Sequence, residues 1–134
     1  MTTVPTFVTF FADFADDAVF NAAGDVERPG GNAIAAALCH QLAEEGVPVF
    51  PPVQHSFYGW AFATKPKGAL GFVLQYVDPW LLICENQGGV APDEFIAMVH
   101  ATHRALVSDP RFSSVQWFTR TEFDKGAQGA NEPV

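Results

Sequence analysis

Large and small residues alternate along residues 57–85 in a pattern that predicts three adjacent β-strands. The runs FYGWAFATK, GALGFVLQYV and WLLICE are separated only by Pro66-Lys67-Gly68 and Asp78-Pro79. Successive side chains of a strand point to opposite faces of a sheet, so one face collects the bulky residues. These are Tyr58, Trp60, Phe62, Leu70, Phe72, Leu74, Tyr76, Trp80 and Leu82. The other face collects the small residues Gly59, Ala61, Ala63, Ala69, Gly71 and Val73. The pattern therefore predicts an antiparallel meander in which only the bulky face needs covering to form a core.

The pattern on either side of the meander predicts two amphipathic helices. Asn32 is the expected N-cap of a helix over residues 33–45, which Gly46 ends. Its apolar stripe consists of Ile34, Leu38 and Leu42. A second helix is expected to begin near Asp93 and to end before Asp109-Pro110. A proline disfavours helical geometry at the residue that precedes it. Its buried stripe comprises Phe95, Val99, Thr102 and Leu106.

Two further segments predict strands at the ends of the domain. Residues 6–14 are rich in β-branched and aromatic residues, and residues 113–120 place Val115 and Trp117 on one face. The predicted order is β-α-β-β-β-α-β, an α+β fold in which two helices pack on one face of an antiparallel sheet. Residues 1–123 form a single domain in this interpretation, and residues 124–134 form a polar flexible tail.

Composition and charge limit the kinds of molecule that this domain is expected to bind. The chain has 134 residues, of which 49% are hydrophobic and 16% charged. A chain of this size can bury a stable core without cross-links such as disulfide bonds. Fifteen acidic against seven basic side chains give a net charge of −8. This charge disfavours nucleic acid and anionic membranes, which are polyanions, and favours a basic protein partner.

Cysteine usage and hydropathy predict a cytoplasmic protein. The cysteines, Cys39 and Cys84, are interpreted as buried thiols in a reducing compartment, since two cysteines make no disulfide framework. No apolar run approaches the roughly 20 residues of a membrane span.

Catalytic and metal-binding patterns are weak. His100 and His103, three residues apart on the second helix, could reach one metal ion, but we interpret them as structural. Cys39 and His40 are neighbours on a helix and point about 100° apart, so they cannot form a nucleophile–base pair. No phosphate-binding glycine loop or GxSxG sequence is present. We therefore expect no catalytic residues, no cofactor and no metal.

Carboxylates gather in a long loop that precedes the first helix. This stretch, residues 13–27, is called the acidic loop below. Carboxylates can steer a basic partner while an exposed aromatic side chain supplies the apolar anchor. The predicted partner-binding residues are Asp13, Asp16, Asp17, Phe20, Asp25, Glu27, Glu44 and Glu45. A loop that is merely solvated remains the alternative.

Two other uses of the fold stay open. One is a small-molecule-binding or enzymatic domain with a pocket between sheet and helices, lined by His55, Tyr58, Trp60 and His103. The other is a homodimer formed through the small-residue face of the meander.

The order of these sequence features resembles a known class of proteins. An acidic, cysteine-poor chain in which YGWAF is followed by DPWLLI, a helix and DPRFSSVQWF resembles the single-domain immunity partners of bacterial toxins in layout. The resemblance implies an inhibitor that occludes a basic toxin and performs no chemistry. The quoted motifs are interpreted as fold signatures, so no functional residue carries over from them.

Overall fold

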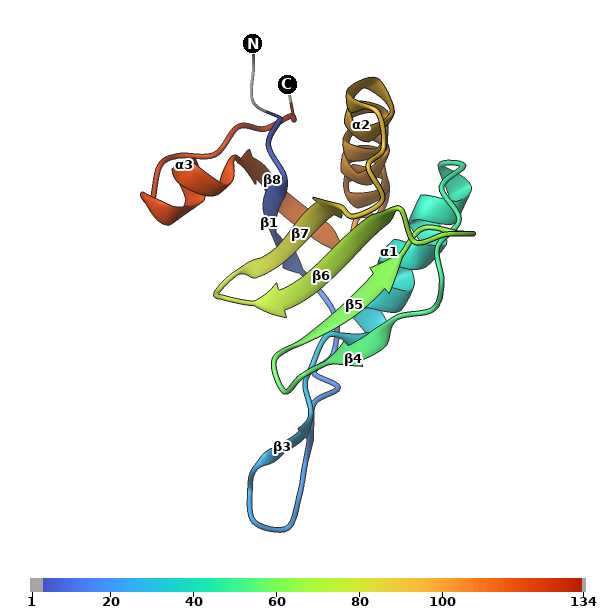
Figure 1. Cartoon of the computed structure of the whole chain (residues 1–134). Coiled ribbons are helices and arrows are strands. Elements are labelled where there is room, and N and C mark those ends of the chain that lie inside the picture. Colours follow the sequence, from blue (N-terminus) through green and yellow to red (C-terminus); the bar gives the residue numbers. More distant parts are fainter. Residues whose placement is uncertain (1–3, 134) are drawn as a thin grey trace.

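The computed structural model describes residues 4–133 and arranges them around a six-stranded antiparallel sheet of strand order β4-β5-β6-β7-β1-β8 (Figure 1). Its strands are β1 (Phe7–Ala12), β4 (Val53–His55), β5 (Gly59–Ala63), β6 (Leu70–Tyr76), β7 (Trp80–Asn86) and β8 (Phe112–Phe118). The short strands β2 (Val19–Phe20) and β3 (Val26–Arg28) form a separate hairpin. The helices are α1 (Asn32–Glu44), α2 (Pro92–Ser108) and α3 (Arg120–Asp124). The predicted α+β class is confirmed.

The central meander follows the predicted alternation. Trp60 on β5 lies opposite Leu74 on β6, which lies opposite Leu82 on β7, and all three are buried. Tyr58 and Tyr76 depart from the pattern, since they are 54% and 59% exposed. Tyr76 is the last residue of β6, and Tyr58 precedes the first residue of β5. The alternation of large and small residues continues through both positions, but the helices do not cover the side chains there.

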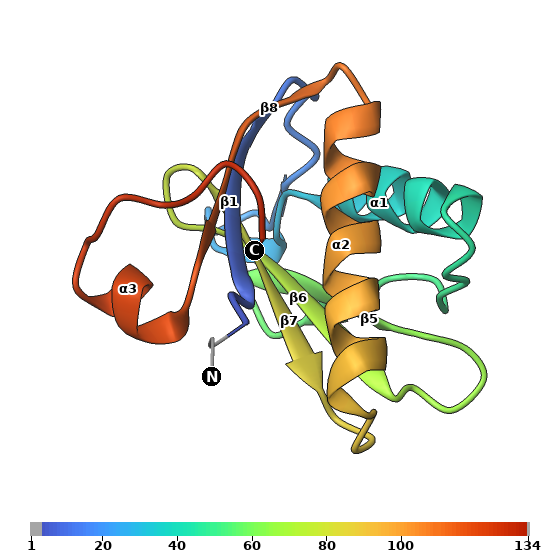
Figure 2. The same ribbon diagram turned by 90° about the horizontal axis from the view of Figure 1, so that it is seen from above.

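The two long helices cover the bulky face. Ile34, Leu38 and Leu42 of α1 and Val99 and Leu106 of α2 are buried, as their spacing predicts. Figure 2 shows α1 and α2 on one side of the sheet and α3 on the other. The core therefore lies between the sheet and the helix pair.

The other face of the sheet, called the outer face below, carries the small residues. Gly59 is required there, because a Cβ at this position would collide with the carbonyl oxygen of Leu74. Phe57 and Val77, which share the odd-numbered register of the small residues, are exposed, whereas Leu81 is 1% exposed. A hollow of about 410 Å³ on this face is bounded by residues that include Ala61, Ala63 and Val73.

A hairpin, a further strand and a third helix were missing from the predicted order. The hairpin β2–β3 lies inside the acidic loop, and the short strand β4 follows Pro51-Pro52 and is exposed along its length. The third, α3, begins with a capping box in which Thr119 and Glu122 satisfy each other's backbone N–H groups.

The C-terminal segment contacts the sheet. Phe123 packs against Phe7 and Phe118 at ring-centroid distances of 5.3 and 5.8 Å. Ala130 exchanges two backbone hydrogen bonds with Trp117 of β8. Only the Ala130 contact lies within residues 124–134, the segment predicted as a flexible tail. Residues 1–3 and 134 lie outside the described residues.

Candidate functional site

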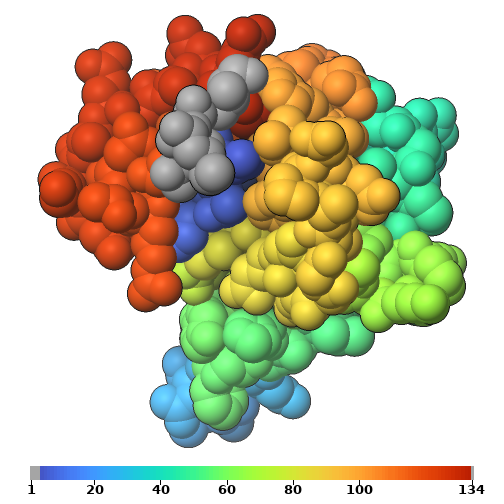
Figure 3. Space-filling model, turned by 45° about the horizontal axis from the view of Figure 1, so that its top comes forward, coloured from blue at the N-terminus to red at the C-terminus, as the bar shows by residue number. Residues whose placement is uncertain are grey.

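Three loops meet at one end of the molecule. They are the acidic loop with its hairpin, the β4–β5 turn at residues 56–58 and the β6–β7 turn at residues 77–79. Figure 3 shows the hairpin and the β4–β5 turn side by side at this end. A pocket of about 410 Å³ opens between the three loops. It is lined by Phe14, Ala15, Asp16, Asp17, Ala18, Val26, Pro29, Gly30, Gly31, Ile34, Phe57, Tyr58, Tyr76 and Trp80. We call it the loop pocket.

Aromatic side chains form much of the wall of the loop pocket. Phe57 is 71% exposed, and Tyr58 and Tyr76 are also more than half exposed. Trp80 is half-buried and meets Tyr76 edge to face at a centroid distance of 5.1 Å. Phe20 lies on the hairpin, two residues after the pocket-lining Ala18, and is exposed as well. Exposed aromatics on neighbouring loops are typical of recognition surfaces rather than of a core.

Asp17 has a structural role at this end. Its Oδ1 accepts the Gly31 N–H and its Oδ2 accepts the Ala33 N–H, both at 2.8 Å. The carboxylate therefore caps α1 from the acidic loop and satisfies donors that the helix leaves unpaired. The prediction that Asn32 is the N-cap is wrong: the N-cap is Gly31, with φ at 108°. Asp17 is thereby occupied within the fold.

The other carboxylates of the acidic loop remain available. Asp13, Asp16, Asp25 and Glu27 are exposed, and none of them forms an ion pair within residues 4–133. Asp16 Oδ1 accepts the Ala18 N–H at 3.0 Å and holds the loop at the rim of the pocket. All four side chains are therefore free to meet a partner, and Asp16 is the one of them that lines the loop pocket.

The β6–β7 turn adds a carboxylate that the sequence analysis missed. Asp78 accepts a hydrogen bond from the Tyr76 hydroxyl at 3.0 Å. This bond raises the pKa of Tyr76, and desolvation and the charge of Asp78 act in the same direction. Tyr76 and Trp80 face each other as the last paired residues of β6 and β7. The signal for them was Asp78-Pro79, which ends the pairing and leaves both rings at the sheet end.

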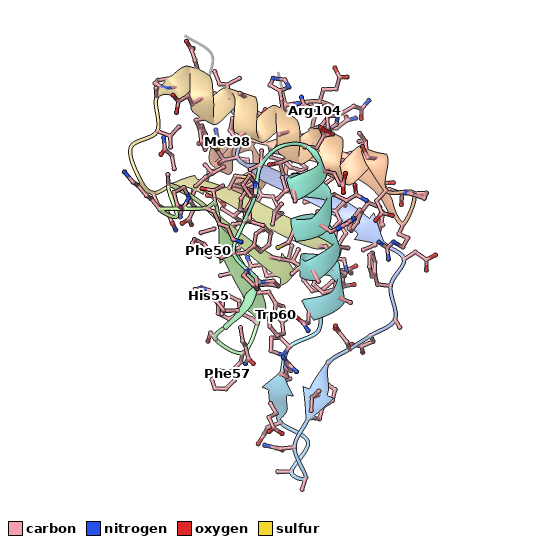
Figure 4. All side chains as sticks on the ribbon, turned by 90° about the vertical axis from the view of Figure 1, so that its right-hand side faces the viewer. Phe50, His55, Phe57, Trp60, Met98 and Arg104 are labelled. Atoms are coloured by element: carbon pink, nitrogen blue, oxygen red, sulfur yellow. The ribbon has the colours of Figure 1, made fainter. Side chains whose placement is uncertain are left out.

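Glu44 and Glu45 do not belong to this cluster. They lie at the C-terminal end of α1, about 20 Å along the helix from Gly31. Glu45 Oε2 lies 3.2 Å from Nε of Arg104 on α2 and forms an ion pair with it. Glu44 Oε1 lies 3.9 Å from His40 Nε2. Figure 4 places Arg104 at the end opposite Phe57. The structure thus separates these two predicted site residues from the acidic loop.

The four residues of the alternative pocket do not converge. His55 and Tyr58 meet edge to face at 5.5 Å, but Trp60 is buried and its Nε1–H donates to the Pro29 carbonyl at 3.1 Å. His103 lies on α2, where its Nδ1 accepts the Trp117 Nε1–H at 3.0 Å. Burial lowers the pKa of His103. Only Tyr58 of the four lines the loop pocket.

The thiols and the metal-ligating side chains are arranged for structure. Burial raises the pKa of Cys39 and of Cys84 to about 12, which keeps both thiols protonated. Within residues 4–133, no three His, Cys, Asp or Glu side chains come together as a metal site. No helix of this described part is long and apolar enough to cross a membrane.

Comparisons with protein-family models, curated protein sequences and solved structures found no significant match to this chain. Function is therefore inferred from the geometry of the end at which the three loops meet, called the loop end below.

Proposed function

We propose that this protein is a noncatalytic binding domain, of the immunity-inhibitor type, that occludes a basic protein partner with its loop end. One observation carries the proposal: within residues 4–133, acidic-loop carboxylates that form no ion pair adjoin exposed aromatics of neighbouring loops at one end of the molecule. Carboxylates raise the association rate with a basic partner and disfavour acidic ones, while desolvated aromatics supply most of the binding energy.

The proposed binding set is revised from the sequence prediction. It keeps Asp13, Asp16, Phe20, Asp25 and Glu27 and adds the aromatic wall formed by Phe57, Tyr58 and Tyr76. Asp17 supports the set by capping α1. We place the protein in the cytoplasm, where the free thiols Cys39 and Cys84 would stay reduced.

Charge reversal tests this function. The variant Asp16→Lys/Asp25→Lys/Glu27→Lys changes the charge of the loop end and leaves the Asp17 cap intact. The matched control, Glu44→Lys/Glu85→Lys/Glu132→Lys, makes the same change at exposed acids elsewhere. Wild type and control should capture the same basic protein from a lysate of the native host, and the loop variant should lose it.

Kinetics with the captured protein make the test quantitative. At low salt, the association rate of the loop variant should be at least about tenfold lower than that of wild type. This difference should shrink as the salt concentration increases. Equal recovery and equal association rates for the two triple variants would contradict the proposed function.

A small-molecule-binding domain is a second candidate, and the loop pocket favours it. Its volume of about 410 Å³ lies within the range of ligand sites, and hydroxyl and carboxylate groups stand at its rim. A metabolite that raises the Tm of wild type but not of Tyr76→Ala would support this candidate. A partner that binds only through the loop end would support the first one instead.

A further inference from the structure

The loop pocket combines aromatic walls with carboxylates and contains no cationic side chain. Its lining, all within the described residues, includes Asp16 and Asp17 but no lysine, arginine or histidine. Tyr58, Tyr76 and Trp80 supply aromatic rings on the sheet side, and Asp16 lies on the acidic loop. From this arrangement we infer that the pocket receives an arginine side chain of the basic partner. The inference rests on the proposed function and names the group that anchors it.

The electrostatics of the pocket select a cation. Aromatic faces carry negative potential, and a cation placed over such a face is stabilised by about 0.5–1 kcal/mol at exposed sites. Asp16 Oδ1 is engaged by the Ala18 N–H, while its Oδ2 accepts no hydrogen bond from residues 4–133. That oxygen can accept an N–H of an incoming group.

Arginine fits this site better than lysine. A guanidinium group is planar and weakly hydrated, so it can stack on a ring while its edge donates hydrogen bonds to a carboxylate. The protein already holds one guanidinium over an aromatic ring next to the pocket: Arg28 Cζ lies 5.3 Å from the Trp60 ring centroid. Arg28 itself is not part of the pocket lining, so the pocket is left to a group from outside.

The test uses the tripeptide Ac-Gly-Arg-Gly-NH2 and its citrulline analogue, which has nearly the same shape and no charge. Each is titrated into the ¹⁵N-labelled full chain, and the indole N–H signals of Trp60, Trp80 and Trp117 are followed by NMR. Trp80 lines the pocket, whereas the Trp117 indole is bound to His103 between α2 and β8. The arginine peptide should shift the Trp80 signal saturably with millimolar affinity and leave the Trp117 signal in place.

Two variants locate the site. Asp16→Asn should weaken binding of the arginine peptide about threefold, because it removes an exposed charge pair. Tyr76→Leu should weaken it by a similar factor, because it removes one aromatic face. The control Asp93→Asn, at the start of α2, should leave the affinity unchanged. Equal shifts with the citrulline peptide, or shifts at Trp117 as large as at Trp80, would overturn the inference.

The outcomes separate this inference from the proposed function. If charge reversal abolishes capture but the arginine peptide leaves Trp80 unmoved, the pocket assignment fails and the partner surface stands. If the peptide binds at Trp80 but capture is indifferent to charge reversal, the partner is not the source of the arginine and the inference fails with the proposed function.

Discussion

Asp17 is the side chain that joins the acidic loop to the helical layer. Its two hydrogen bonds to the Gly31 and Ala33 N–H groups cap α1 across 14 and 16 residues of sequence. We expect Asp17→Ala to lower the free energy of unfolding by about 1–2 kcal/mol, the usual cost of a lost cap. Urea denaturation measures this. The exposed Asp25→Ala should change stability by less than about 0.5 kcal/mol, and equal effects would contradict the capping role.

Gly31 is required by conformation and by space. Its φ is 108°, and a Cβ there would lie 2.9 Å from Trp80 Cζ3. Gly46 is a matched comparison, because its φ is also positive, at 81°, but a Cβ there would meet nothing within 4 Å. Both alanine variants should cost about 1 kcal/mol of backbone strain, and Gly31→Ala about 1 kcal/mol more for the collision. Thermal unfolding of the two variants checks the difference; equal losses would show that the Trp80 ring moves aside freely.

His103 gives the protein a pH-dependent stability. Its pKa is lowered, first by burial, so the unfolded state binds a proton more readily than the folded state. The contribution of His103 is therefore complete above the unfolded pKa of about 6.5 and is lost as pH falls below that value. Protonation of Nδ1 would also break the hydrogen bond from Trp117.

Urea midpoints between pH 7.5 and 5 measure this effect. They should fall more steeply for wild type than for His103→Gln. His40→Gln, at an exposed position on α1, should keep the wild-type slope. Identical slopes for wild type and His103→Gln would contradict the assignment.

Among the elements, α3 is held against the sheet by one aromatic side chain, Phe123. Phe123 packs between Phe7 and Phe118 on the outer face. Phe123→Ala should lower the free energy of unfolding by about 1–2 kcal/mol, because the side chain is half-buried. Lys125→Ala, just beyond the helix, is the control and should have little effect. Denaturation curves that coincide for both variants would mean that α3 contributes nothing to the fold.

The meander was predictable because its signal is local. Trp60, Phe72 and Leu82 recur at alternate positions, and a strand turns that spacing directly into one buried face. Tyr76 has the same spacing but is exposed, because burial depends on what lies above the strand end. The strand β4 gave no such signal, since all its residues are exposed and only its pairing with β5 defines it.

The whole molecule is expected to be a monomer at neutral pH. A two-fold dimer through the outer face would need a self-complementary surface of about 800 Å² per subunit. That face is hollowed beside β4 and β5, and two hollows facing each other pack poorly. A net charge of −8 on each copy adds repulsion. Light scattering on the purified protein in solution should give the monomer mass of 14.5 kDa. Twice that mass would restore the homodimer hypothesis.

The acidic residues show which part of the candidate site was predictable from sequence and which part only the structure decides. The cluster of Asp16, Asp25 and Glu27 was predictable because these residues are close along the chain. Glu45 has the same chemistry, but α1 carries it to the opposite end, where it pairs with Arg104. Asp17 cannot be distinguished from Asp16 by sequence, because its role is set by the helix end that folds against it.

Local spacing and composition were sufficient to specify the alternating core of the meander, most of the buried stripes of α1 and α2 and the net negative charge. These features depend on the periods of strand and helix and on composition, which the chain carries in any conformation. The loop pocket, the Asp17 cap and the aromatic wall depend on contacts between segments far apart in sequence. Only the packed sheet and helices decide which side chains meet there.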